Sequence, residues 1–323
     1  MNTVLSVIIP AFNEQEMIHK TAQTISTLLE SHSIPYELIF VDDGSKDQTW
    51  FQIVEATKAY DHINGIRFSR NFGKESAIFA GLSTAYQSRG PEEKGCCVVI
   101  DCDLQHPPEK IIDMYRLWQQ GFQVVEGIKL DRGKENVLHT LAAKCFYCMI
   151  SKATNIDMSH ASDFKLLDDK AVQALLSMPE RNAFFRALSS WIGFQTAQVE
   201  FEVQDRTVGK SKWSTLSLIK YAIRNITSFS TFPMQIVSVL GVLMLLASVV
   251  LGGIALIQKC LGVALEGFTT VIIIQLFTGS IVMISLGIIG YYLAKMYEEL
   301  QRRPRYLISE SCGGLKDDTK TIG

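Results

Sequence analysis

The chain has 323 residues, of which 47% are hydrophobic and 20% are charged, and its formal net charge is −2. These values allow a full-sized buried core and more than one domain. The charge excludes no class of partner and gives only a weak argument against nucleic acid. The seven cysteines are odd in number and lack the paired spacing of a zinc site, which favours a reduced, cytosolic chain.

Strands and helices are predicted to alternate over the first hundred residues. Apolar, β-branched runs predict strands at residues 4–10, 36–41, 64–68 and 96–100, and helices are expected between them. The expected helices cover about residues 14–30, 47–60 and 73–87. This alternation predicts an α/β fold with a mostly parallel sheet and helices on both faces. Because the crossovers are right-handed, the carboxyl ends of these strands should lie along one edge of the sheet.

Two carboxylates and an amide follow the uncharged strand at residues 96–100. Asp101, Asp103 and Gln105 would stand at the exposed end of this strand, which is where ligands bind in α/β sheets. Oxygen ligands at this spacing suit Mg²⁺ or Mn²⁺, with coordination positions left open for the phosphates of a substrate. The alternative is a solvated acidic turn.

Two amphipathic segments lie between the sheet and the C-terminal third of the chain. Residues 181–194 and 213–229 carry apolar side chains at helical spacing among basic ones. They are interpreted as helices at a membrane surface, and the alternative is a pair of ordinary helices facing the core. The tail from residue 309 to 323 is expected to be disordered.

Residues 226–258 and 267–294 contain no formal charge, and each run exceeds the roughly 20 residues that cross a bilayer. Two buried core helices are the alternative. The short connection carries Lys259 alone, whereas basic residues flank both runs, which predicts that both flanks face the cytoplasm. No signal peptide is expected at the start of the chain. The flanking basic residues are Arg206, Lys210, Lys212, Lys220, Arg224, Lys295, Arg302, Arg303 and Arg305.

A series of short motifs in this order resembles the family 2 glycosyltransferases with the GT-A fold. More narrowly, the chain resembles the polyprenyl-phosphate glycosyltransferases, which include dolichyl-phosphate mannose synthases and bactoprenol glucosyltransferases. The motifs are Pro10-Ala11-Phe12-Asn13-Glu14, Val41-Asp42-Asp43-Gly44-Ser45, Ser69-Arg70-Asn71-Phe72-Gly73-Lys74-Glu75, Asp101-Cys102-Asp103-Leu104-Gln105, Asp163-Phe164-Lys165-Leu166-Leu167-Asp168, Pro179-Glu180-Arg181 and Ser211-Lys212-Trp213.

The resemblance implies a role for each motif. The first two strand ends would hold the nucleotide-sugar through Pro10, Ala11, Asn13, Glu14 and Asp42, with Lys74 and Asp101 nearby. Asp101, Asp103 and Gln105 would hold the divalent metal, and Asp103 would be essential for catalysis. The candidate ligands for the pyrophosphate or the acceptor phosphate are Lys74, Lys129, Arg132, Arg206 and Lys212.

Asp163 stands where the family would place a catalytic base. A lipid phosphate has a second pKa near 6, so it is already largely ionised at neutral pH and has little proton to lose. Asp163 is therefore expected to orient Arg132, Lys129 or sugar hydroxyls, or else to cap a turn. The sequence departs from the family pattern at Lys165, where relatives usually have Arg, at Asn225, and at His106, which is expected to lie behind the metal ligands.

The resemblance implies an inverting, metal-dependent transfer of one sugar from a nucleotide-sugar to undecaprenyl phosphate at the inner membrane. UDP-glucose is the first choice of donor, and UDP-N-acetylglucosamine and GDP-mannose are alternatives. A catalytically silent membrane scaffold and a processive polysaccharide synthase are alternatives of other classes. The expected partners are a separate flippase and a downstream glycosyltransferase, and a homo-oligomer is compatible with the sequence.

The expected organisation follows from these assignments. Residues 1–210 form a cytoplasmic catalytic domain, and 211–230 form an interfacial helix. Residues 231–258 and 267–294 form two transmembrane helices, and 295–323 form a cytoplasmic tail.

Overall fold

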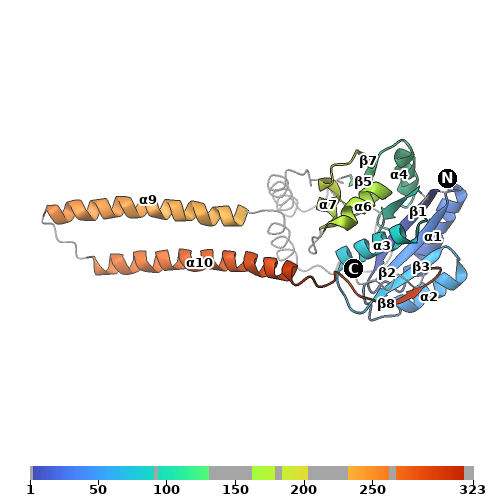
Figure 1. Ribbon diagram of the computed structural model, residues 1–323, viewed down its shortest axis with the longest axis horizontal. Coiled ribbons are helices and arrows are strands. Elements are labelled where there is room, and N and C mark those ends of the chain that lie inside the picture. The colour runs from blue at the N-terminus through green and yellow to red at the C-terminus, as the bar shows by residue number, and fades with distance from the viewer. Residues whose placement is uncertain are drawn as a thin grey trace. The chain divides into compact units, whose positions relative to one another are not determined.

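The computed structural model describes residues 3–90, 94–130, 162–178, 184–202, 232–261 and 267–315. These residues divide into two compact units. The first unit contains a sheet with its helices and includes the segment that begins at Arg303. The second unit contains the two long helices α9 (Phe232–Cys260) and α10 (Phe268–Leu300), which contact each other (Figure 1).

The first unit is built on an eight-stranded sheet with the order β7-β5-β6-β4-β1-β2-β3-β8. Helices pack on this sheet, and the chain alternates between strand and helix as far as β5. The strands are β1 (Thr3–Ala11), β2 (Tyr36–Asp42), β3 (Ile63–Phe68), β4 (Lys94–Val99), β5 (Val124–Lys129), β6 (Lys165–Asp168), β7 (Thr196–Phe201) and β8 (Ile308–Cys312). The helices are α1 (Ile18–Ser31), α2 (Thr49–Ala59), α3 (Lys74–Ser88), α4 (Lys110–Gln119), α6 (Asp169–Ser177) and α7 (Phe185–Trp191).

The centre of the sheet is parallel, as the sequence predicts. Strands β4, β1, β2 and β3 run in one direction, and most of their residues are buried. Residues buried on both faces explain why these strands read as continuous apolar runs. In the pairing of β1 with β2, Ala11 lies opposite Asp42, and in the pairing of β1 with β4, Ile8 lies opposite Val99. The loops after these three strands therefore leave the same edge of the sheet.

Antiparallel strands complete the sheet on both sides of this parallel centre. β6 pairs antiparallel with β4 and β5, and β8 pairs antiparallel with β3. The expectation that the tail is disordered from residue 309 was therefore wrong for residues 309–312, which belong to β8. The tail is held at this edge because Tyr306 stacks on Phe68 with ring centroids 5.1 Å apart.

The segment at residues 181–194 contains α7, which faces the core of the first unit. Phe185 is fully buried and Leu188 is almost so, whereas Trp191 is 65% exposed. The apolar spacing of this segment thus reflects core packing, the alternative considered from the sequence. The second amphipathic segment, residues 213–229, lies outside the described residues.

The two helices of the second unit are long and apolar enough to cross a membrane. The spans that meet this criterion are Met234–Ile254 and Ile274–Leu300, with mean hydropathy of 2.5 and 1.8. Their side chains are not buried inside the structure, which argues against the alternative of two core helices.

Candidate active site

The loops after β1 and β2 are joined by hydrogen bonds. The Asn13 amide donates to Ser45 Oγ over 2.9 Å, and the Lys46 amide donates to Asn13 Oδ1 over 3.0 Å. The Glu14 amide donates to Thr49 Oγ1 over 2.9 Å. Asn13 has a φ of 55°, a left-handed conformation that Asn tolerates better than most residues. These contacts fix the predicted nucleotide-binding loops against each other.

Asp42 is a fully buried carboxylate, and one of its two oxygens accepts no hydrogen bond from the described residues. Its Oδ1 accepts a hydrogen bond from the Ser45 amide over 2.9 Å, while its Oδ2 lies 3.3 Å from Arg67 Nε. Oδ2 accepts no hydrogen bond from the described part of the chain. Burial raises the pKa of Asp42, and its hydrogen bonds with Ser45 and the charge of Arg67 oppose this shift. A buried carboxylate oxygen without a donor is a ready acceptor for a ligand hydroxyl or N–H group.

Asp43 ties the same loop to the start of α3. Its carboxylate accepts hydrogen bonds from the amides of Phe72 over 2.6 Å and Gly73 over 2.9 Å. Burial raises the pKa of Asp43 to about 6, although both amides favour the charged form. Gly44 has a φ of +65°, and a Cβ at this position would lie 2.4 Å from the Arg70 carbonyl carbon. The close approach of two backbones therefore explains the glycine in this motif.

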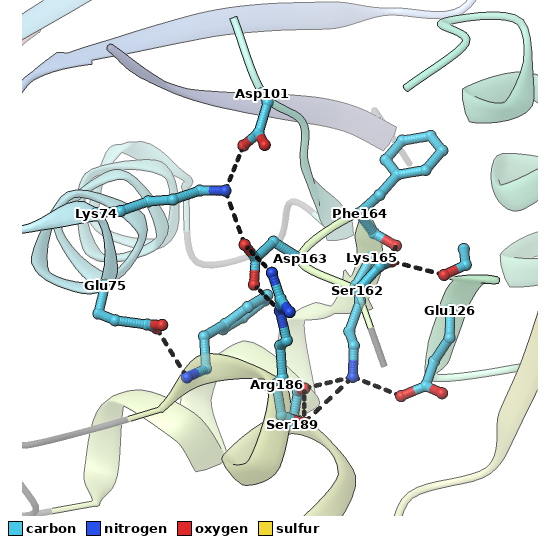
Figure 2. Close-up of polar contacts among 12 residues, drawn as sticks. Lys74, Glu75, Asp101, Glu126, Ser162, Asp163, Phe164, Lys165, Arg186 and Ser189 are labelled. Carbon is cyan, nitrogen blue, oxygen red and sulfur yellow. Dashed lines mark hydrogen bonds and ion pairs between the residues drawn. The ribbon is translucent and has the colours of Figure 1, made fainter. Parts of the chain in front are cut away.

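A cluster of four charged side chains comes from four parts of the first unit. Figure 2 shows Lys74, the first residue of α3, reaching between Asp101 after β4 and Asp163 before β6. Lys74 Nζ lies 2.6 Å from Asp101 Oδ1 and 2.7 Å from Asp163 Oδ2. Arg186 of α7 binds Asp163 through two hydrogen bonds, of 2.6 Å from Nε and 2.9 Å from Nη2. Asp163 thus links two cations at the carboxyl edge of the sheet.

These ion pairs determine the protonation state of Asp163. Burial alone would raise its pKa, but Lys74 and Arg186 hold the pKa well below its usual range. The pKa of Lys74 is raised, because Asp101 and Asp163 outweigh the effect of burial. Asp163 is therefore ionised at neutral pH, and its two oxygens are already used by cations. A weakly basic, fully paired carboxylate is a poor general base.

Glu75 adds a third carboxylate, which lies beside the cluster. Its Oε2 accepts a hydrogen bond of 2.8 Å from the Phe185 amide, which places it next to the first turn of α7. Burial, followed by the charge of Asp163, raises the pKa of Glu75 to about 7. The amide of Phe185 and the charges of Arg186 and Lys74 act in the opposite direction. Glu75 thus holds the helix that presents Arg186.

The predicted metal ligands lie in the turn that follows β4. Asp103 Oδ1 accepts a hydrogen bond from the Gln105 amide over 3.1 Å, and the Asp101 side chain is 29% exposed. Among the described residues, no three His, Cys, Asp or Glu side chains form a compact metal cluster. The ligands predicted from the sequence are two carboxylates and the amide of Gln105, oxygen donors of the kind that Mg²⁺ and Mn²⁺ prefer. Lys74 serves as the counter-ion of Asp101 in this structure.

Comparison with known proteins assigns the family. The family model described as glycosyl transferase family 2 matches residues 6–169. An uncharacterized glycosyltransferase of Synechocystis sp. is 34% identical over 315 residues, covering 97% of this chain and 97% of that protein. The chain belongs to glycosyl transferase family 2.

Two further proteins are similar to this chain, one a sequence relative and the other a solved structure. A prophage bactoprenol glucosyl transferase homolog of Escherichia coli K12 is 34% identical over 307 residues, which cover 94% of this chain and 98% of that protein. A solved structure of glucosyl-3-phosphoglycerate synthase from Mycobacterium tuberculosis, in complex with Mn²⁺ and uridine-diphosphate-glucose, has a TM-score of 0.47. It is 18% identical and covers 70% of this chain and 77% of that chain. The first of these similarities extends over both units of the glycosyltransferase.

The structure describes only part of the predicted phosphate-binding set. Lys74 belongs to the charged cluster, and Lys129 is the exposed last residue of β5. Arg132, Arg206 and Lys212 lie outside the described residues, as does Asn225. Pro10 and Ala11 end β1 beside β2.

The sequence of this glycosyltransferase did not predict the observed partners of Asp163, and it did not indicate Arg186 or Glu75 as site residues. Asp163 was expected to orient Arg132, Lys129 or sugar hydroxyls, or to cap a turn; among the described residues its oxygens bind Lys74 and Arg186, and Arg132 lies outside those residues. Arg186 was missed because its position 23 residues after Asp163 gives no local signal. Glu75 was missed as a site residue, although an acidic residue in the first turn of a predicted helix could have indicated it.

Lys165 and His106 have roles in packing. Lys165 is fully buried on β6, where its Nζ lies 2.5 Å from Glu126 Oε1 and donates to Ser189 Oγ over 2.8 Å. This ammonium stabilises the contact between the sheet and α7. His106 stacks on Phe164 with ring centroids 5.1 Å apart, and burial lowers the pKa of its imidazole. His106 thus packs as a neutral ring behind the turn that holds Asp101 and Asp103.

Proposed function

We propose that this glycosyltransferase transfers one sugar from a nucleotide-sugar to a polyprenyl phosphate at the cytoplasmic face of a membrane. The observation that carries the proposal is the extent of the bactoprenol glucosyl transferase similarity, which covers 94% of this chain. That similarity includes both the charged site and the two helices that are long enough to span a bilayer. This combination suits a reaction between a soluble donor and a lipid acceptor.

The nucleotide is expected to bind at the loops after β1 and β2. Asp42 Oδ2 supplies an acceptor for a base N–H or a ribose hydroxyl, while Pro10, Ala11, Asn13 and Glu14 form the adjoining loop. UDP-glucose is the first choice of donor. UDP-N-acetylglucosamine and GDP-mannose remain the alternatives, because the same acceptor can bind either base.

The phosphates of the two substrates require cations, and the cluster around Asp163 supplies them. Lys74 presents a compact ammonium, and Arg186 presents a planar guanidinium that can bind a phosphate through two hydrogen bonds. Asp101, Asp103 and Gln105 would hold Mg²⁺ or Mn²⁺, which would neutralise the nucleoside diphosphate that leaves.

Asp163 acts as a positioning residue in this proposal. Its carboxylate holds Lys74 and Arg186 within one site, and its low pKa leaves no proton-accepting role at neutral pH. The lipid phosphate is already ionised and attacks without prior proton removal. With one acceptor and no separate protein nucleophile, the reaction is a single displacement that inverts the anomeric centre.

The test uses the full-length protein reconstituted in lipid nanodiscs. The protein is incubated with undecaprenyl phosphate and each of UDP-glucose, UDP-N-acetylglucosamine and GDP-mannose, and the lipid product is identified by mass spectrometry. We expect one donor to give a sugar-phospholipid whose mass increases by a single sugar. Formation of no lipid product with any donor, in a preparation that is folded and contains Mg²⁺ or Mn²⁺, would contradict the proposal.

A further inference from the structure

The segment that follows α10 returns to the catalytic sheet. β8 runs antiparallel to β3 at the edge of the sheet (Figure 1), and Glu310 lies opposite Arg67 in this pairing. The Ser69 amide donates to the Leu307 carbonyl over 3.0 Å, and Ser309 Oγ donates to the Arg67 carbonyl over 3.1 Å. The end of the chain thus forms part of the unit that contains the proposed donor site.

Glu310 is held from two elements of the first unit. Its Oε1 accepts a hydrogen bond from Arg67 Nη1 over 2.8 Å, and its Oε2 accepts one from the indole Nε1 of Trp50 over 2.9 Å. Because Trp50 lies in α2 and Arg67 in β3, the carboxylate has a defined position although half of its side chain is exposed. Glu310 therefore fixes the far end of the Arg67 side chain.

The near end of the same guanidinium contacts the loop that is proposed to bind the nucleotide. Arg67 Nε lies 3.3 Å from Asp42 Oδ2, the carboxylate oxygen that accepts no hydrogen bond from the described residues. Arg67 Nη2 donates to the Ser45 carbonyl over 3.4 Å. One arginine side chain thus connects β8 to both Asp42 and the turn at Ser45.

We propose that Glu310 is a positioning residue for donor binding, acting through Arg67 on Asp42. The inference rests on the proposed function, because it assumes that Asp42 Oδ2 accepts a hydrogen bond from the nucleoside. Without Glu310, the Arg67 guanidinium is free to turn toward solvent, since 30% of its side chain is already exposed. Asp42 and the Ser45 turn then lose one of the contacts that orient them.

The linkage is reciprocal, so nucleotide binding also strengthens the docking of β8. Cys312 reports on this docking, because it ends β8 and packs against the hydrophobic core. Burial raises the pKa of the Cys312 thiol, which favours the less reactive thiol form while β8 is docked. Bound nucleotide should therefore slow the alkylation of Cys312.

The first experiment measures nucleotide affinity in nanodiscs by isothermal titration with UDP and with GDP. Glu310→Gln keeps the size of the side chain and an acceptor for Trp50 but removes the charge that holds Arg67. We expect Glu310→Gln to weaken binding of the preferred nucleotide about two- to five-fold, as for loss of a partly exposed ion pair. In turnover assays the KM for the donor should rise by a similar factor, with kcat changing less than two-fold.

The matched control is Glu55→Gln. Glu55 lies 2.7 Å from Lys58 in a surface pair on α2, so this change removes a carboxylate of similar exposure from an ion pair of similar length. Its nucleotide affinity should equal that of the wild type. An affinity of Glu310→Gln that also equals the wild type would overturn the inference.

A double-mutant cycle separates the proposed linkage from a general loss of stability. If Glu310 acts through Arg67, then the effect of Glu310→Gln on affinity should largely vanish in an Arg67→Met background, which removes the cation. Additive effects of the two changes would count against the linkage.

In a protein with Cys260→Ser, UDP or GDP should slow alkylation of Cys312, measured by peptide mass spectrometry, and Glu310→Gln should reduce this protection.

The outcomes distinguish the two proposals. If neither UDP nor GDP binds the folded wild type, then the proposed nucleotide-sugar function fails and this inference fails with it. If a nucleotide binds the wild type and Glu310→Gln equally, only the role of Glu310 is refuted.

Discussion

Replacing Asp163 by Asn tests the assignment of this residue as the link between two cations. The substitution keeps the shape of the side chain but removes its charge, and it places an amide donor against two groups that also donate. Asp163 is only 5% exposed, and its oxygens bind Lys74 and Arg186. The change therefore leaves both cations without their shared carboxylate.

The structure sets the expected size of the effect on stability. Removal of one partner of a buried ion pair typically costs about 3–5 kcal/mol. The side chains of Lys74 and Arg186 are 41% and 26% exposed, so water compensates for part of this loss. We expect a loss of about 1–3 kcal/mol, which corresponds to roughly 2–4 °C in Tm per kcal/mol for a unit of this size.

The effect on stability should depend on pH with a defined sign. The pKa of Asp163 is depressed in the folded protein, so its stabilising contribution is present above the ordinary carboxyl pKa of about 4 and is lost as pH falls below it. The difference in Tm between wild type and mutant should be full at pH 7 and should shrink below about pH 4.

The pH dependence of kcat distinguishes a positioning role of Asp163 from a role as general base. We expect kcat of Asp163→Asn to fall about 10- to 100-fold, because Lys74 and Arg186 lose the carboxylate that positions them. This fall corresponds to about 1.4–2.7 kcal/mol of activation free energy. The acidic limb of the pH profile, near pH 6, should remain because it belongs to the lipid phosphate. The assay is kcat against pH in nanodiscs, with Asp113→Asn on the surface of α4 as a control that should retain wild-type rates. Disappearance of the acidic limb in Asp163→Asn would refute the reasoning.

Three further predictions concern the metal, a second titrating group and the topology. Asp103→Asn should abolish turnover while Tm stays within about 2 °C, since one partly exposed carboxylate contributes little to stability, and near-normal turnover would exclude Asp103 as a metal ligand. Burial raises the pKa of Glu75 to about 7, so the wild type should lose stability as pH rises from about 4.5 through 7. Glu75→Gln should flatten this slope of stability against pH, measured in thermal melts, by roughly 1 kcal/mol per pH unit, and an unchanged slope would contradict the assignment. A reporter fused after Gly323 should read cytoplasmic, and a cysteine at Gly262 in a Cys260→Ser protein should react with an impermeant reagent from outside; labelling only after lysis would reverse the topology.

Local patterns in the sequence were sufficient for the parallel half of the fold. The strands β1 to β4 are largely apolar runs bounded by turn residues, and burial on both faces produces this pattern whatever the rest of the chain does. The loop motifs at Asp42 and Asp101 follow such runs directly, so their position at one edge of the sheet could be predicted from chirality alone. The apolar helices α9 and α10 were predictable for the same reason, since length and lack of charge are local properties.

The tertiary structure alone decided which charged groups meet. Lys74 and Asp163 are 89 residues apart in sequence, and Arg67 and Glu310 are 243 apart, so no periodicity links them. The antiparallel strands β6 and β8 were missed because β6 is very short and β8 contains polar side chains that pair at an edge. Composition predicted a disordered tail, but pairing with β3 supplies the hydrogen bonds that a polar segment needs to become ordered. Long-range contacts of this kind depend on how the whole chain closes, which is why the sequence predicted the individual loops but not the ion pairs between them.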